Sequence, residues 1–420
     1  MFLAKFWLTL TAFSSRVIHN YDPSTAMVAV DTLYDVGSRD EDASLTGLAH
    51  LFEHLMFGGS AHIPDFDAEM ERAGGINNAS TSCDFTNFYD VAPAVNFETL
   101  LWLESDRMLG LALSPQSLEV QRSVVIEEFK QTHLNRPYGD LSHRLREMLY
   151  TTHPYRYPTI GKEVSHIERV TMDDVKHWFY SHYAPNNAVL AVSGNVTPEE
   201  CRRLVEKWYG SIPRREIAPR LWTPEPPVDR PRETTVRADV PRAMVVAAFP
   251  MPGYGEEGYI EADLITDILA SGRSSRFYTR LLGVNPLFAE ADASIIGSEE
   301  AGFLMLKAQL NEGMEDRTSE ALEAMLAQAY ALRDTAGPDT PDGVSDDEVT
   351  RAVNRYVSNS EFSAISHLGR AEALALAEMH GEDVNSIVGR YRNATTPSVA
   401  RAAKSILDPA HLCVLTYLPA

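Results

Sequence analysis

The hydrophobic positions of the chain follow two different periods. Runs in which nearly every residue is apolar or β-branched occupy 26–38, 188–194, 243–253 and 303–310, and they predict buried strands. Apolar residues recur at helical spacing in 48–56, through much of 97–209 and in 259–272, where they predict helices. Because strands and helices are interleaved, the pattern indicates α+β domains, each with a sheet backed by helices.

A proline-rich stretch divides the chain. Prolines recur through 212–232 among alternating charges, and proline fixes the backbone and removes a hydrogen-bond donor, so we expect an extended linker. We therefore predict a first domain at 1–215, a linker at 216–235 and a second domain at 236–420. Both halves open with a strand-like run, a helical run and a glycine stop, which suggests an internal duplication.

Composition narrows the range of functions. The 420 residues are 44% hydrophobic, which suffices for proper cores, and the formal net charge of −22 disfavours nucleic-acid binding. No apolar run approaches the roughly 18 residues of a membrane span. Cys83, Cys201 and Cys413 are too few and too scattered for a disulfide framework, which favours the cytoplasm, although a periplasmic location stays open. Residues 1–15 alternate like a strand rather than a signal peptide.

The run GLAHLFEHLMFGG at 47–59 places His50, Glu53 and His54 in an apolar helical pattern. Positions four apart lie about 40° apart around a helix, so the two histidines share a face and can each give one nitrogen to zinc. Glu53 lies beside them, where it could hold a metal-bound water and act as general base. Histidines that face solvent or are satisfied in the core are the alternative, but polar groups buried in such a helix need compensation, which a cation supplies.

A catalytic zinc site needs a third protein ligand and one open position. The helical pattern QRSVVIEEFKQ at 121–131 offers Glu127 and Glu128, of which only one can face the ion. The spacing does not choose between them, and a solvated helix face is the alternative for either.

Five stretches together resemble the insulinase/pitrilysin family of zinc metallopeptidases, the inverzincins, and in particular bacterial subunits similar to the mitochondrial processing peptidase. They are DVGSRDEDASLTGLAHLFEHLMFGGS, AGGINNASTSCDFTNFYD, LESDRM, QRSVVIEEFKQTHLNRPYG and LASGRSSRFY. The resemblance implies two homologous α+β domains, each a mostly antiparallel sheet flanked by helices, that form one shell of a clamshell. It also implies a second domain without the metal motif.

The resemblance also assigns roles to single residues. The glutamate that closes the family's Arg-x-Val-Val-x-x-Glu pattern is Glu128, which would be the third zinc ligand, with Glu127 as the fallback. Gln121 stands where many relatives carry a second glutamate and would be an uncharged partner behind the ligands. Asn78 and Ala79 match an edge strand to which peptide substrates add by main-chain pairing. An ordinary turn, in which the asparagine holds its own backbone, is the alternative.

The second half departs from the family pattern. Leu282 stands where the family has an arginine and Ala289 where it has a tyrosine, and no tyrosine occurs between Tyr278 and Tyr330. Either a homologous subunit without zinc supplies that half of the site in a heterodimer, or the chain has a non-catalytic role. A homodimer is a further possibility.

These observations predict a zinc endopeptidase subunit that cleaves peptides or unfolded segments in an enclosed chamber. It would need a partner subunit to supply the arginine and the tyrosine of the active site. His50, His54 and Glu128 would hold Zn²⁺ and Glu53 would move the proton. The rival is a non-catalytic assembly subunit, comparable to the core proteins of respiratory complexes. The complete His-x-x-Glu-His favours the enzyme.

Overall fold

The computed structural model describes residues 6–8 and 16–420, except residues 218 and 221. The chain forms two compact units, and neither is continuous in sequence. The first unit comprises Met1–Lys130, Tyr157–Trp222 and Ser360–Ile387, and the second comprises Gln131–Arg156, Thr223–Asn359 and Val388–Ala420. Among the described residues, no helix is both long and apolar enough to cross a membrane.

The first unit is built on a six-stranded sheet in the order β1-β2-β6-β3-β5-β4. The strands are β1 Phe6–Leu8, β2 Arg16–Tyr21, β3 Met27–Tyr34, β4 Ile76–Thr81, β5 Thr86–Pro93 and β6 Ala188–Gly194. The β2–β6 pair is parallel, and the other neighbours are antiparallel. Of the strand expected at 1–15, β1 is described, and residues 1–5 and 9–15 lie outside the described residues.

The second unit contains a five-stranded sheet in the order β7-β11-β8-β10-β9. Its strands are β7 Arg232–Ala238, β8 Met244–Met251, β9 Phe288–Ile296, β10 Gly302–Leu310 and β11 Cys413–Pro419. Again one pair, β7–β11, is parallel and the rest are antiparallel. This order repeats β2-β6-β3-β5-β4, which supports the predicted duplication, and the predicted fold class of two mostly antiparallel α+β halves is confirmed.

Several helices of each half pack on the sheet of that half. Those of the first half are α1 Leu48–Leu55, α2 Phe66–Arg72, α3 Phe97–Leu109, α4 Pro115–Phe129, α5 Leu141–Leu149, α6 Val164–Arg169, α7 Met172–His182 and α8 Pro198–Tyr209. Those of the second half are α9 Tyr259–Ala270, α10 Thr318–Tyr330, α11 Asp346–Ser363, α12 His367–Met379, α13 Val384–Arg392 and α14 Thr396–Ile406.

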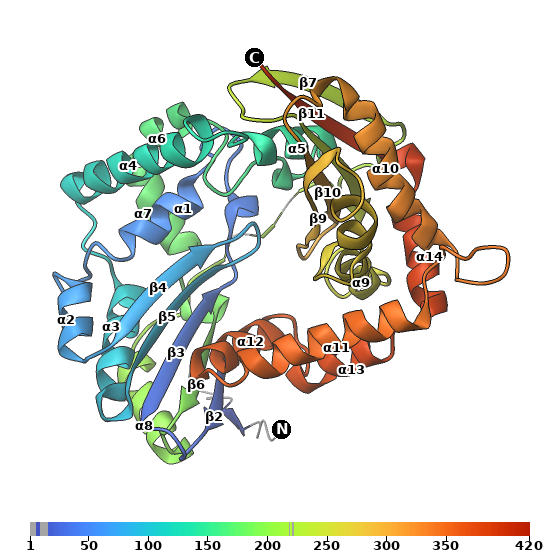
Figure 1. The fold of residues 1–420 in the computed structure, drawn as a ribbon. Coiled ribbons are helices and arrows are strands. Elements are labelled where there is room, and N and C mark those ends of the chain that lie inside the picture. The colour runs from blue at the N-terminus through green and yellow to red at the C-terminus, as the bar shows by residue number, and fades with distance from the viewer. Residues whose placement is uncertain (1–5, 9–15, 218, 221) are drawn as a thin grey trace. The chain divides into compact units, whose positions relative to one another are not determined.

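Two helices exchange sheets, so the units differ from the continuous domains predicted at 1–215 and 236–420. Helix α12 packs on β3, β6 and β2 of the first sheet (Figure 1), and α5 contacts β11 of the second. The exchange has a packing reason. The residues of β3 alternate between two cores, and the face with Ala29 and Leu33 is covered by Ala371, Leu374 and Ala375 of α12. Small alanines let the helix approach the sheet closely.

The proline-rich segment is extended, but it ends earlier than predicted. Regular structure is absent from its described residues until β7 begins at Arg232, so the last four positions of the predicted linker 216–235 are strand. After Pro231 the chain has no proline until Pro241, so nothing removes ladder donors there. The linker is held at both ends: Arg220 pairs with Asp35 of the first unit, and Glu225 accepts from Thr151, Thr152 and His153 of the second.

Candidate metal centre

Helix α1 separates its apolar and polar residues cleanly. Its buried positions are Leu48, Ala49, Leu51, Phe52 and Leu55. Phe52 packs on Tyr183, with ring centroids 4.4 Å apart, which anchors the helix in the core. The partly buried positions are His50, Glu53 and His54, so all three polar side chains leave the helix on the face away from the core. The amphipathic pattern therefore orients the motif.

The start of α1 is fixed by its backbone. Gly47, the N-cap, has φ +92°, and a Cβ added there would lie 2.7 Å from the carbonyl oxygen of Ile160, so only glycine fits. The carboxylate of Glu41 accepts from the N–H groups of Gly47, at 2.9 Å, and Ala49, at 2.8 Å. It thereby satisfies two of the N–H groups that a helix start leaves unpaired. The second of them, that of Ala49, directly precedes His50.

Helix α4 brings a carboxylate to the two histidines. Oε2 of Glu128 lies 3.8 Å from Nε2 of His50 and 3.5 Å from Nε2 of His54. Glu127 points elsewhere and pairs with Lys130 at 2.6 Å. Among the described residues, His50, His54 and Glu128 form a group whose ligand atoms all lie within 4.8 Å of one another. The structure thus brings Glu128, rather than Glu127, to the histidines.

The electrostatics of the cluster suit a cation. Burial, with a smaller contribution from the neighbouring His54, lowers the pKa of His50 to about 4, so His50 is neutral and can donate a lone pair. Burial raises the pKa of Glu53, and the charge of Glu128 adds to the rise, while a hydrogen bond from Thr81 opposes it.

The donor set fits zinc by chemistry and size. Two imidazole nitrogens and one carboxylate oxygen are the ligands of one common class of catalytic zinc site. Such ligands around a tetrahedral ion stand about 3.3 Å apart. The nitrogen-to-oxygen separations of 3.8 and 3.5 Å are longer than ordinary hydrogen bonds and close to that value. The residues present therefore match a site with three protein ligands.

Strand β4 lies beside this cluster and is the open edge of the first sheet. Its exposure alternates, so Asn77, Ala79 and Thr81 share the face that is partly buried. The hydroxyl of Thr81 donates a hydrogen bond to Oε2 of Glu53. Thr81 was missed by the sequence reasoning, although its place two residues after Ala79 puts it on the same face of the strand.

Asn78 and Ala79 lie in the middle of β4, so the segment is a strand and not the alternative turn. Oδ1 of Asn78 accepts the N–H of Ala79 at 2.9 Å. This N–H is therefore directed away from β5, and by the alternation of an antiparallel strand Asn77 also turns its backbone groups to the open edge. The asparagine does hold its neighbouring backbone, as the alternative supposed, but within a strand.

The other predicted positions have simpler surroundings. Gln121 is partly buried on α4, and its side chain makes no hydrogen bond within the part of the chain that the structure describes. Leu282 ends a short π-helix, Tyr278–Leu282, and Ala289 lies in the edge strand β9. Arg276 is buried and pairs with Glu348 at 2.7 Å, so it is engaged within the second unit.

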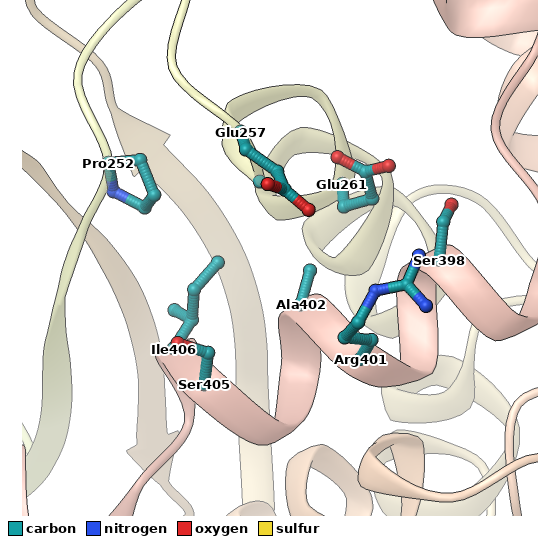
Figure 2. Close-up of a pocket in the computed structure, with 9 residues that line it drawn as sticks. Pro252, Glu257, Glu261, Ser398, Arg401, Ala402, Ser405 and Ile406 are labelled. Carbon is teal, nitrogen blue, oxygen red and sulfur yellow. The ribbon is translucent and has the colours of Figure 1, made fainter.

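The second unit has a shallow cavity at the matching helix start (Figure 2). Its volume is about 300 Å³, and Glu257, Glu261 and Arg401 face it from the two sides. Glu261 is the third residue of α9, as His50 is the third of α1. These groups are not joined in any ion pair among the described residues, and the cavity offers no histidine or cysteine.

A duplicated α+β chain whose first half alone carries the His-x-x-Glu-His helix has the architecture of a zinc-protease-like protein. A family model for insulinase (peptidase family M16) matches residues 16–163, and one for the peptidase M16 inactive domain matches residues 169–356. The chain belongs to the insulinase/pitrilysin family, peptidase family M16.

A relative of known name agrees with this assignment, and solved structures share the fold. The chain is 30% identical over 272 residues to zinc protease PqqE of Helicobacter pylori, a match that covers 64% of this chain and 61% of that protein. The crystal structure of a protease from Helicobacter pylori superposes with a TM-score of 0.88 at 23% identity over 99% of each chain. The periplasmic protease PqqL from Escherichia coli matches with a TM-score of 0.79 at 17% identity, over 99% of this chain and 47% of that one.

Proposed function

We propose that this chain is the zinc-binding subunit of an endopeptidase that cleaves peptides or unfolded segments. The observation that carries the proposal is the convergence of His50, His54 and Glu128, from two helices, with Glu53 on the same face of α1. The zinc proteases among its relatives support the same reading.

The three converging residues would hold the ion, and each has a defined part. His50 and His54 would give imidazole nitrogens, and Glu128 would give one negative charge. When bound, zinc supplies a Lewis acid that polarises the scissile carbonyl and makes water more acidic. The Glu128 side chain keeps 39% of its surface accessible, so the cluster is open on one side to a substrate.

Glu53 would transfer the proton. One of its oxygens accepts from Thr81, and the other makes no hydrogen bond in the described part of the chain. That free oxygen can take a proton from the attacking water and return it to the leaving amine, as a general base and then a general acid. Its position on α1 next to His54 keeps it close to the ion that His54 would bind.

The edge strand β4 would hold the substrate. Asn78 and Ala79 lie at its centre, and backbone groups of this strand are directed to the open edge. An extended peptide that pairs with this edge gains affinity from main-chain hydrogen bonds and therefore tolerates varied sequences. Because Asn78 already covers the N–H of Ala79, its amide would turn aside when a peptide pairs there.

A homologous partner without zinc would complete the site. Leu282 and Ala289 cannot hold a developing oxyanion, because neither side chain has a donor. The match of 99% of this chain to 47% of PqqL, a chain about twice as long, supports a second shell of the same fold. The partner would supply the arginine and the tyrosine.

The direct test compares the wild type with Glu53→Gln at equal zinc content, in the presence and absence of co-purified partner. We expect the variant to bind zinc normally and to cleave a fluorogenic peptide at least about 100-fold more slowly, the low end of the loss that follows removal of a general base. Wild-type cleavage by the variant would refute the assignment. A purified chain without stoichiometric zinc would favour the non-catalytic assembly role, for which Leu282 and Ala289 are the supporting observation.

A further inference from the structure

The carboxylate of Glu53 is held on one side only. The Thr81 hydroxyl donates to its Oε2, while Oε1 has no hydrogen-bond partner among the described residues. A hydroxyl that can rotate is a weak constraint unless its own backbone is fixed. The value of this contact therefore depends on how firmly the end of β4 is held.

The chain after Thr81 is fastened through its backbone to the segment before α1. The N–H of Ser38 donates to the carbonyl oxygen of Ser82 at 3.1 Å, and the N–H of Arg39 donates to that of Cys83 at 3.0 Å. These two bonds tie the β4–β5 hairpin to the loop that follows β3. The residue next to Thr81 is thus part of a hydrogen-bonded corner.

Side chains strengthen the same corner. Nη1 of Arg39 donates to Oδ1 of Asp84 at 2.7 Å, and both residues are buried, with 2% and 5% of their surface accessible. A Cβ added to Gly37 would lie 2.4 Å from the carbonyl oxygen of Cys83, so the two segments touch. A buried, charge-assisted hydrogen bond and close backbone packing leave the hairpin little freedom to shift.

We propose that Thr81 is a positioning residue that holds Glu53 in the orientation it needs as the base, and that it links this orientation to the strand on which the peptide pairs. The proposal rests on the proposed function. Because Thr81 belongs to β4, an extended peptide on that edge and the carboxylate of Glu53 are both located by the same strand. Because the hairpin is held in place, the strand fixes the peptide and the carboxylate relative to each other, which keeps the scissile bond and the base in register.

The test compares Thr81→Val, which keeps the shape and removes the hydroxyl, with Thr81→Ser, which keeps the hydroxyl. Thr235→Val, the same exchange at an exposed position of β7, is the matched control. With the partner present, we expect Thr81→Val to lower kcat about 10- to 100-fold, the range for a lost hydrogen bond to a charged group. KM should stay within about twofold and zinc content should be unchanged. Thr81→Ser should recover most of kcat.

A second measurement needs neither zinc nor activity. In the metal-free protein, the unfolding constants of Thr81→Val, Glu53→Ala and the double variant give the coupling between the two residues, which we expect to be at least about threefold. Unchanged kcat in Thr81→Val, or no coupling, would overturn the positioning role. If the wild type cleaves no peptide with or without partner, the proposed function fails, and the coupling alone then decides whether Thr81 holds Glu53.

Discussion

The stability of the first unit depends on pH through Glu41, and substitution of this residue by glutamine should remove that dependence. Its carboxylate accepts the N–H groups of Gly47 and Ala49, at 2.9 and 2.8 Å, and so caps the helix that carries His50. Burial raises the pKa of Glu41 to about 8, although the two N–H groups and their positive helix end act against the rise. The folded chain therefore binds this proton more tightly than the unfolded one.

The direction and the size of the pH effect on stability follow from the linkage between proton binding and folding. Because the folded pKa is raised, the stabilising contribution is complete below the unfolded pKa near 4.5 and is lost as the pH rises through about 8. At 1.36 kcal/mol per pH unit, this amounts to at most about 5 kcal/mol, and to less because the side chain is only partly buried. Glu41→Gln removes this pH dependence, since an amide does not titrate.

The effect of Glu41→Gln on the free energy of unfolding should therefore change sign with pH. At pH 5 the Gln variant should be less stable by about 1–3 kcal/mol, because its NH₂ group faces an N–H that has lost its acceptor. At pH 8 it should be more stable than the wild type, because the wild type has by then lost most of the stabilisation that the raised pKa of Glu41 provides. Urea unfolding of the metal-free protein at pH 5, 6, 7 and 8 measures the difference directly. A variant that is less stable at every pH would show that Glu41 is ionised throughout and would refute the reasoning.

Three further substitutions test the site and the core. Glu128→Gln should weaken zinc binding at least about 100-fold in a chelator competition, while Glu127→Gln, its exposed neighbour, should not; equal losses would contradict the assignment of Glu128. Gly47→Ala should lower the free energy of unfolding by about 1–3 kcal/mol, since φ is positive and Cβ would meet Ile160, and an unchanged urea midpoint would argue against this geometry. Ala375→Leu should cost about 1–3 kcal/mol by overpacking α12 on β3, which thermal unfolding would show; no loss would mean that α12 packs loosely.

Local features were predictable because neighbours in sequence create them. The strands β6 and β10 and the helices α1 and α9 follow from hydrophobic periodicity, and the shared face of His50 and His54 follows from helical geometry. Glu53 lies on that face for the same reason. The third candidate ligand could not be chosen in this way. The spacing fitted Glu127 and Glu128 equally well, and only the resemblance to a family favoured Glu128.

Other features depend on contacts between distant segments. Thr81 was missed because nothing in its own neighbourhood indicates that its hydroxyl reaches Glu53, 28 residues earlier. The compact units differ from the continuous domains of the prediction, because α5 and α12 have patterns that fit any apolar sheet face and the prediction assigned each to its own half.

The sequence by itself determined the class of fold, the central strands, the motif helix and the types of side chain that could hold a metal, since all of these arise from periodicity and residue type within short stretches. Only the tertiary structure decided which glutamate of α4 meets the histidines, which strand edge lies beside Glu53 and which sheet each exchanged helix covers. The physical reason is that packing selects among partners by shape and by the burial of complementary surfaces. These are properties of two segments together, and neither segment carries them alone.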